Sequence, residues 1–273
     1  MQDPVCLIGL DQPEIQSIQK CLDLPIMAHE TLPRIILKDD TLFVQVPNTL
    51  WFAPVSKVVF HGIFEDDLDF IAALALWSGP CFPDPQAMMD CRLKLPCLVK
   101  ALQHTRFGDL QRGYLSPGAE FQASNTYVAK WGNWHCGENK ECFTGSWKAQ
   151  YPSIIEEFLT GTSIRITIIG DHHWQVQMEG TDWRKSIHDQ RSKIVPADPE
   201  LVQDTIQVGR ALGLKVLAND YMITEKGSKY LLEVNHIPNV THFQEMWQAY
   251  QNYIIQWILT APVKPGTRNQ SKK

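Results

Sequence analysis

The sequence predicts an α/β (α+β) protein with two or three lobes. Three observations predict it. Residues 1–82 alternate strand and helix patterns, residues 152–178 carry two strands joined by a turn, and a capped helix near 198–212 is followed by two further strands. Such alternation is typical of sheets that are covered by helices.

The composition narrows the classes of function. The 273 residues are 44% hydrophobic and 20% charged, which is ordinary for a globular enzyme, and the net charge of −5 argues against a dedicated nucleic-acid binder. No run of 18 apolar residues is present, so no transmembrane helix is expected. The first residues carry Asp3 and no basic segment, and the seven cysteines include no CxxC pair. We therefore expect no signal peptide, reduced thiols and a cytoplasmic location.

The first 82 residues predict a small α/β domain. Apolar runs at 5–10 and 57–62 are typical of buried strands. The segment 64–79 is rich in apolar residues, begins with acidic residues and ends at Gly79. Acidic starts and glycine ends are favoured by helices, so this segment is predicted to be helical.

The middle of the chain predicts a helical segment followed by strands. Residues 84–103 have a helical pattern, which Pro96 must kink or split. Residues 124–131 predict a strand with Lys130 near its end. In the segment 152–178, isoleucines at 164, 166 and 168 alternate with polar residues, so Arg165 is expected to face away from the isoleucine row.

The last third predicts a helix, a strand hairpin and a final helix. Asp198 suits the helix N-cap, Pro199 the first helical position and Gly213 the position just past the end. Strands are predicted near 215–223 and 229–235, joined by the short turn "TEKGSK". A helix with one apolar stripe follows at 241–259, and the basic end of the chain, 263–273, is expected to be a flexible tail.

The strand "LLEVNHIPN", 231–239, carries the most informative chemistry. Alternate side chains of a strand face one way, so Glu233 and Asn235 are expected to share a face, beside Leu231. Asp220 lies on the preceding strand, which the short turn pairs with this one. Three hard oxygen ligands at one place suit Mg²⁺, or Mn²⁺ in its stead. The alternative is a solvated strand face with three unrelated polar residues.

The order of motifs over residues 84–245 resembles the C-terminal half of an ATP-grasp ligase. "IIEEFLTGTSIRITIIGD", "GTDWRKS" and "VGRALGL" come before Asp220 and "EVN", as in the branch that includes RimK-like and glutathione-synthetase-like enzymes. The resemblance implies four parts. These are an N-terminal pre-ATP-grasp α/β domain at 1–82, a small lobe at 83–150 with phosphate-binding lysines and a flap, a large lobe at 151–262 with the metal site, and the tail at 263–273.

The resemblance implies a role for individual residues. Glu157, Phe158 and Leu159 match the hinge that holds the adenine, and Ser163 matches a ribose contact. Lys130 and Lys94 match the two lysines that reach the phosphates, with Arg92 a second choice for the latter. Arg184 matches the arginine near the γ-phosphate. Asp220, Glu233 and Asn235 match the metal ligands. Arg165, in the strand that follows the hinge, is a further catalytic candidate, which could bind a substrate carboxylate or only a structural acid.

The resemblance implies an ATP-dependent carboxylate–amine ligase. Such an enzyme uses ATP and Mg²⁺ to form an acyl-phosphate, which an amine converts to an amide with release of ADP and phosphate. The expected partners are small-molecule or peptide carboxylates and amines, and a homodimer is common in the family. The alternative is a nucleotide-binding regulatory protein that keeps the fold without ligase activity. Ser163 favours this alternative, because the family usually has Asp there to hold the ribose.

The stretch "VAKWGNWHCGENKECF", 128–143, has three interpretations. His135, Cys136 and Cys142, together with His61, could hold zinc, but their spacing matches no common zinc pattern. Cys136 could be a nucleophile, although acyl-phosphate chemistry needs none. The favoured interpretation is a flap over the triphosphate, in which Trp131 and Trp134 either stack on a ligand or only pack.

Overall fold

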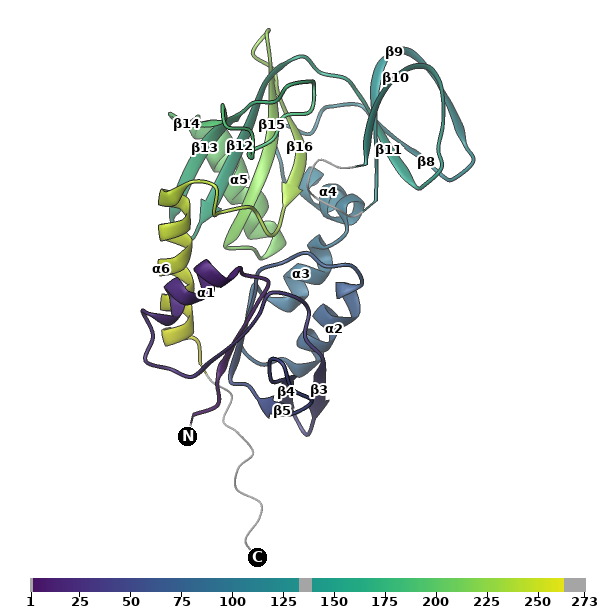
Figure 1. The fold of residues 1–273 in the computed structure, drawn as a ribbon. Helices are drawn as coiled ribbons and strands as arrows, with labels where there is room; N and C mark the ends of the chain where they lie inside the picture. Colours follow the sequence, from purple (N-terminus) through teal and green to yellow (C-terminus); the bar gives the residue numbers. More distant parts are fainter. Residues whose placement is uncertain (1, 133–138, 263–273) are drawn as a thin grey trace, which may run out of the picture. The chain divides into compact units, whose positions relative to one another are not determined.

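The computed structural model describes residues 2–132 and 139–262, and the chain divides into two compact units (Figure 1). Met1–Met89 and Trp247–Lys273 make up the first unit, and Asp90–Met246 makes up the second. The segment after Trp247 thus groups with the N-terminal part of the chain. The four-part division expected from the sequence stays a prediction.

The first unit is built on a parallel sheet with the strand order β2-β1-β6-β7. Its strands are β1 Val5–Ile8, β2 Ile26–His29, β6 Lys57–Phe60 and β7 Cys81–Phe82. The central strands β1 and β6 are buried along their whole length, as expected for parallel strands that are covered on both faces. The helices α1 Gln12–Gln19 and α2 Asp67–Trp77 follow β1 and β6. The predicted α/β character is confirmed.

A second, antiparallel sheet in this unit was not expected from the sequence. It has the order β3-β4-β5, with β3 Ile35–Lys38, β4 Thr41–Gln45 and β5 Phe52–Pro54. Its strands are short and only partly buried, so they carry little of the apolar alternation by which strands are recognised.

The C-terminal helix α6, Gln244–Thr260, belongs to the first unit from Trp247 onwards and packs against other parts of that unit. The Lys57 ammonium donates to the carbonyl of Ile258, and Gln251 Nε2 donates to the carbonyl of Ser17 at 2.9 Å. Neither α6 nor any other helix within 2–132 and 139–262 is long and apolar enough to cross a membrane.

The helix predicted over 84–103 is split into α3 Pro85–Cys91 and α4 Lys94–Leu102. Pro96 falls in the first turn of α4, where a missing backbone N–H leaves no intrahelical hydrogen bond unmade. The prediction that Pro96 kinks or splits the helix is therefore confirmed. The split places Lys94 at the first position of α4.

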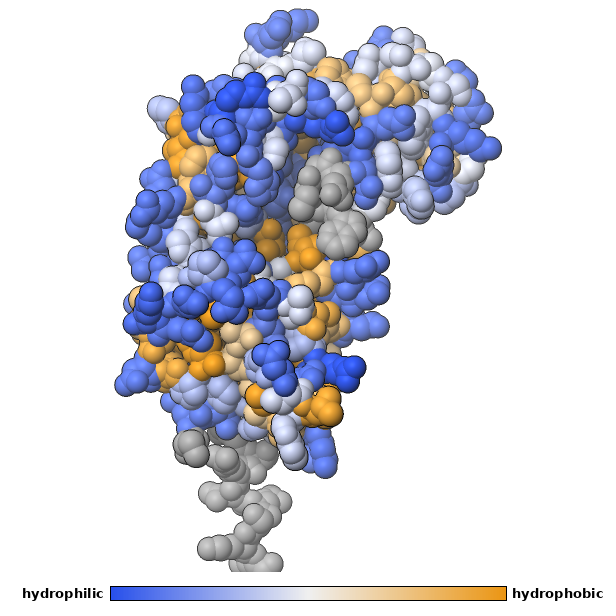
Figure 2. All heavy atoms as spheres, in the orientation of Figure 1, coloured by the Kyte–Doolittle hydropathy of each residue, from blue (hydrophilic) through white to orange (hydrophobic). Residues whose placement is uncertain are grey.

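The second unit contains an antiparallel sheet with the order β10-β9-β11-β8. The strands are β8 Arg112–Leu115, β9 Glu120–Trp131, β10 Lys140–Lys148 and β11 Ser153–Glu157. One face carries a small core of Ala129, Phe143 and Ile155, with aromatic side chains packed around it. Figure 2 shows hydrophobic atoms at the surface of this sheet among mainly hydrophilic ones. The opposite face contributes to the candidate site.

The other sheet of this unit has the order β14-β13-β12-β15-β16 and is antiparallel throughout. Its strands are β12 Gly161–Ile169, β13 His172–Met178, β14 Lys193–Val195, β15 Val216–Thr224 and β16 Lys229–Asn235. The helix α5, Pro199–Leu212, lies against this sheet (Figure 1). The predicted caps are confirmed, because Asp198 accepts the N–H of Glu200 at 2.9 Å and Gly213 has φ of +72°.

A buried carboxylate holds α5 to its surroundings. Asp204 accepts from the Thr105 hydroxyl at 2.7 Å, the Arg106 N–H at 2.7 Å and the Tyr221 hydroxyl at 2.8 Å. Asp204 is fully buried, so these donors replace the water that a carboxylate needs. Burial and the neighbouring carboxylate raise the pKa of Tyr221, which keeps its hydroxyl protonated. The contact links the loop after α4 to the back of β15.

Replacing Asp204 by Ala is expected to lower the free energy of unfolding by about 3 kcal/mol, because three hydrogen-bond donors lose a buried, charged acceptor. Gln203→Ala, at the preceding and exposed position of α5, is the matched control and should change it by less than about 0.5 kcal/mol. Urea unfolding followed by circular dichroism measures both. Equal stability of the two variants would show that Asp204 is not a structural anchor.

Candidate functional site

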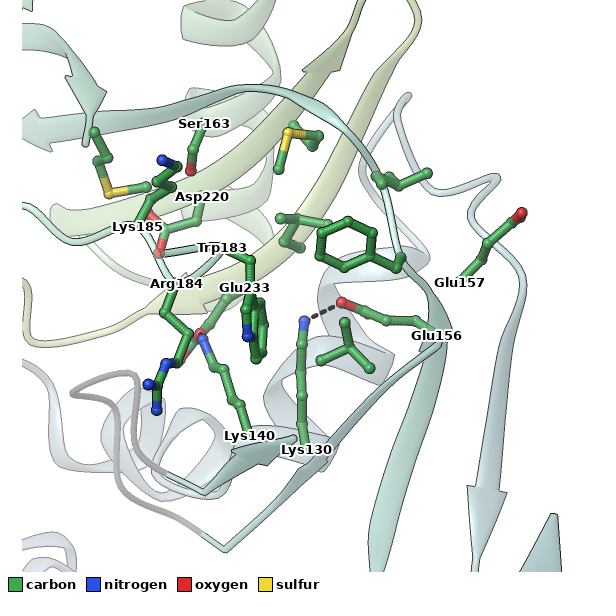
Figure 3. A pocket seen from close by; sticks show the side chains of 16 residues that line it. Lys130, Lys140, Glu156, Glu157, Ser163, Trp183, Arg184, Lys185, Asp220 and Glu233 are labelled. Atoms are coloured by element: carbon green, nitrogen blue, oxygen red, sulfur yellow. Dashed lines mark hydrogen bonds and ion pairs between the residues drawn. The ribbon is translucent and has the colours of Figure 1, made fainter. Parts of the chain in front are cut away.

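A pocket that is partly open to solvent lies between the two sheets of the second unit (Figure 3). Its lining comes from β9, β10 and β11 on one side and from β12, β13, β15 and β16 on the other. Sixteen residues line it: Val128, Lys130, Lys140, Glu156, Glu157, Phe158, Leu159, Ser163, Met178, Trp183, Arg184, Lys185, Asp220, Met222, Leu232 and Glu233. Most of the predicted site residues therefore meet in one place.

The acidic pair Asp220 and Glu233 is set by a bulge in the β15–β16 ladder. Asp220 is the partner of Glu233, but the next residue, Tyr221, is the partner of Leu231, so Leu232 is one extra residue on β16. Directly opposed residues project to the same face of a sheet. Glu233 thus faces the pocket with Asp220, while Leu231 faces α5 with Tyr221. The expectation that Leu231 lies beside Glu233 is wrong, because the bulge breaks the alternation.

Backbone contacts outside the ladder hold this bulge. The N–H of Leu231 donates to the carbonyl of Phe107 at 2.8 Å, and the Arg112 guanidinium donates to the carbonyl of Leu231. These backbone groups thus have partners outside the ladder, in the segment that connects α4 to β8. The position of Glu233 therefore depends on a segment more than a hundred residues earlier in the chain.

Arg165 forms a two-pronged ion pair with Asp220. Its Nε and Nη2 donate to the two carboxylate oxygens at 2.6 and 2.7 Å, from the directly opposed position on β12. Asn235 Nδ2 also donates to Asp220, at 3.3 Å. Arg165 was expected to bind either a substrate carboxylate or a structural acid, and in the structure it binds an acid of the chain itself, Asp220.

Glu233 is held by two lysines. Its Oε1 lies 3.6 Å from the Lys94 ammonium and its Oε2 lies 3.3 Å from the Lys140 ammonium. Burial acts to lower the pKa of Lys140, but the carboxylates of Glu233 and Asp220 have the larger combined effect, so the pKa of Lys140 is raised. Burial, with Lys140 and Lys130 nearby, lowers the pKa of Lys94 although Glu233 opposes this. Lys94, predicted from the sequence, thus reaches the site, and Lys140 was missed.

Lys130 is paired with Glu156, a buried carboxylate at the end of β11. Glu156 also lies 3.4 Å from Arg112 Nε, so one carboxylate serves two cations. Figure 3 shows Lys130 reaching from its strand towards Glu156, while Glu157 points away from the pocket. From the sequence, Glu157 was expected to hold the adenine through its backbone, and Glu156 was not singled out.

Apolar side chains make up part of the pocket lining. The apolar residues of the lining are Val128, Phe158, Leu159, Met178, Met222 and Leu232, of which Phe158 and Leu159 belong to the predicted hinge. The N–H of Phe158 donates to the carbonyl of Thr126 at 3.0 Å, and its ring lies 6.1 Å from that of Trp183 in an edge-to-face arrangement. Ser163 also lines the pocket and is nearly buried. A flat, apolar group with polar edges would fit this part of the site.

Arg184 lines the pocket but is exposed. Its guanidinium donates to Asp182 Oδ2 at 3.1 and 2.8 Å, and 57% of its side chain is accessible. An exposed pair of this kind is weak and exchanges partners readily. Trp183 and Lys185, its neighbours in the chain, also line the pocket and were not singled out from the sequence.

The interpretations of the stretch 128–143 are partly resolved. Trp131 lies on the aromatic face of the sheet, 6.3 Å from the Trp147 ring, so it packs and does not line the pocket. His61 is partly buried in the first unit against the Tyr250 hydroxyl, and desolvation lowers its pKa to about 4. In the described parts of the chain, no three His, Cys, Asp or Glu side chains form a metal-binding group. Trp134, His135 and Cys136 fall outside the described residues.

The donor set of Asp220, Glu233 and Asn235 fits a magnesium ion in type. The two carboxylates face each other across one ladder, and Asn235 lies two residues beyond Glu233 on the same face. Magnesium binds through one or two carboxylates and completes its shell with water and phosphate oxygens, so two carboxylates and an amide suffice. Arg165 and the two lysines are the cations that hold these carboxylates in the structure described here.

No protein-family model matches the sequence, and no curated protein sequence matches it. Solved structures do match. D-alanyl-alanine synthetase A from Vibrio cholerae is 12% identical over 95% of this chain and 98% of that chain, with a TM-score of 0.67. The ATP-grasp ligase PsnB, complexed with a minimal precursor, is 12% identical over 94% of this chain and 100% of that chain, with a TM-score of 0.63.

A third solved structure is the RiPP-associated ATP-grasp ligase of Chryseobacterium gregarium, in complex with ADP and a leader and core peptide. It is 10% identical over 96% of this chain and 98% of that chain, with a TM-score of 0.63. At such identities the similarity concerns the fold. The predicted fold class is confirmed: the chain has the fold of the ATP-grasp ligases.

Neutralising Glu156 by Gln is expected to lower the free energy of unfolding by about 3 kcal/mol, because Lys130 and Arg112 would be left as buried cations without a carboxylate. Glu157→Gln, the next residue and exposed, is the matched control and should have little effect. Urea unfolding of both variants at neutral pH makes the comparison. Equal stabilities would mean that Glu156 does not hold the two cations.

Proposed function

We propose that this ATP-grasp chain is an ATP-dependent ligase that joins a carboxylate to an amine. The observation that carries the proposal is one pocket lined both by apolar side chains, Phe158 and Leu159 of the predicted hinge among them, and by lysines with an opposed acidic pair. ATP likewise combines a flat base with a polyphosphate. The solved structures of similar fold are ligases, which supports the reaction class.

The apolar and the charged side chains of the lining would together orient the nucleotide. The adenine would lie against Phe158 and Leu159, with hydrogen bonds from the hinge backbone, and the ribose near Ser163. Serine is a weaker partner for two ribose hydroxyls than a carboxylate, so the base and phosphates carry more of the affinity. The triphosphate would then extend towards Lys94 and Lys130.

Asp220, Glu233 and Asn235 would hold the magnesium ion. The ion, when bound, supplies positive charge that stabilises the phosphate oxygens as the terminal phosphoryl group moves. Arg165 fixes the orientation of Asp220 by donating to both of its oxygens.

The chemistry requires two anions to approach each other. A substrate carboxylate oxygen bonds to the γ-phosphorus, and the bond from that phosphorus to the β–γ bridging oxygen breaks, which gives ADP and an acyl-phosphate. An amine nitrogen then bonds to the acyl carbon, phosphate leaves and the nitrogen loses a proton. Lys130 and Arg184 would reduce the repulsion in the first step, and no side-chain nucleophile is needed.

The substrates we infer are a carboxylate and an amine on small molecules or peptides. Several of the similar structures contain precursors or peptides: PsnB is complexed with a minimal precursor, the ligase of Chryseobacterium gregarium with a leader and core peptide, and the macrocyclase MdnC from Microcystis aeruginosa with the precursor peptide MdnA. A panel that mixes amino acids with carboxylate-containing peptides therefore covers both classes.

The purified protein is expected to release ADP in the presence of Mg²⁺ with at least one member of such a panel, and Glu233→Ala should slow this release about a hundredfold or more. Glu225→Ala, an exposed carboxylate in the β15–β16 turn, is the control and should keep full activity. Coupled ADP detection measures the rates.

Equal turnover in Glu233→Ala and the wild type would refute the metal assignment. Tight ATP binding without ADP release on any substrate would instead favour the nucleotide-binding regulatory protein. That outcome would keep the pocket assignment and remove the ligase reaction.

A further inference from the structure

Lys140 stands directly opposite Lys130 in the ladder of β9 and β10. Directly opposed residues project to the same face, and both lysines line the pocket. Figure 3 shows their side chains extending into the pocket from neighbouring strands. Two like charges at opposed positions repel each other, so this arrangement is unfavourable unless anions lie between or beyond them.

In the described parts of the chain, the carboxylates that pair with these lysines are fewer than the cations. Among the residues that the structure describes, Lys94 and Lys140 share Glu233, and Lys130 and Arg112 share Glu156. The network thus pairs four cations with two carboxylates. Arg165 does not change the balance, because Asp220 neutralises it. A surplus of positive charge at the end of a pocket favours a ligand that carries several negative charges.

The burial of the lysines makes the surplus significant. The side chains of Lys94, Lys130 and Lys140 are only 12%, 14% and 19% accessible. Holding unbalanced ammonium groups away from water is unfavourable, and a purely structural role for Lys140 would need only one lysine for Glu233. Lys94 already fills that role.

We propose that Lys140 is a third lysine for the nucleotide's phosphates, placed by β10 beside Lys130 and held ready by Glu233. This inference rests on the proposed function and adds a binding residue that the sequence did not indicate. A lysine is a compact charge on a flexible stem, so Lys140 can leave Glu233 for a phosphate oxygen without movement of its strand. Glu233 would then exchange this lysine for the metal ion.

Nucleotide binding tests the proposal without any need for turnover. Isothermal titration of ATP, ADP and adenosine, each with Mg²⁺ and with EDTA, compares the wild type with Lys140→Ala. We expect ATP and ADP to bind roughly tenfold to a hundredfold more weakly to the variant, because a charge-assisted contact is lost. Adenosine, which has no phosphate, should bind equally to both proteins, which also verifies that the variant is folded.

Two further variants complete the design. Lys140→Arg keeps the charge and should recover most of the affinity for ATP. Lys148→Ala removes an exposed lysine from the other end of the same strand and should leave all three affinities unchanged.

Unchanged ATP affinity in Lys140→Ala, or an equal loss for adenosine, would overturn the role of Lys140 and leave the proposed function standing. Failure of the wild-type protein to bind ATP at all would overturn both.

Discussion

Glu233 faces Asp220 across the β15–β16 ladder because Leu232 adds one residue to β16. If the ladder continued from the Tyr221–Leu231 pair without a bulge, Leu232 would lie opposite Asp220, and Glu233 would lie opposite Asn219, which is fully buried. The backbone contacts of Leu231 with Phe107 and Arg112 keep the offset in place. The rest of the site depends on this single irregularity, since it turns an ordinary hairpin into a pair of opposed carboxylates.

The carboxylates and cations of the pocket hold one another at the positions where a nucleotide and a metal ion would need them. Lys130 rests on Glu156, Lys140 on Glu233 and Arg165 on Asp220. A polyanion and a divalent cation bound together would replace these contacts with equivalent ones, so little reorganisation is required. Charged groups fixed in advance are the main means by which enzymes stabilise phosphoryl transfer.

The sequence predicted the parts of the fold that have strong local patterns. The caps of α5, the alternating isoleucines of β12 and the position of Lys130 near the end of β9 were readable from neighbouring residues. The partners of Lys140 and Glu156 were not, because they depend on strand register and on residues far away in the chain. The β16 bulge left no local signal either, so alternation placed Leu231 on the wrong face. The grouping of α6 with the first unit depends equally on contacts between the two ends of the chain.

The most direct measurement of the central claim is the binding of Mn²⁺, a paramagnetic substitute for Mg²⁺, followed by electron paramagnetic resonance at a fixed concentration of ADP. The opposed carboxylates predict that ADP strengthens Mn²⁺ binding to the wild-type protein and that Glu233→Gln abolishes this effect. The substitution keeps the size of the side chain and removes only its charge. Nucleotide-dependent Mn²⁺ binding of equal strength in Glu233→Gln would contradict the account.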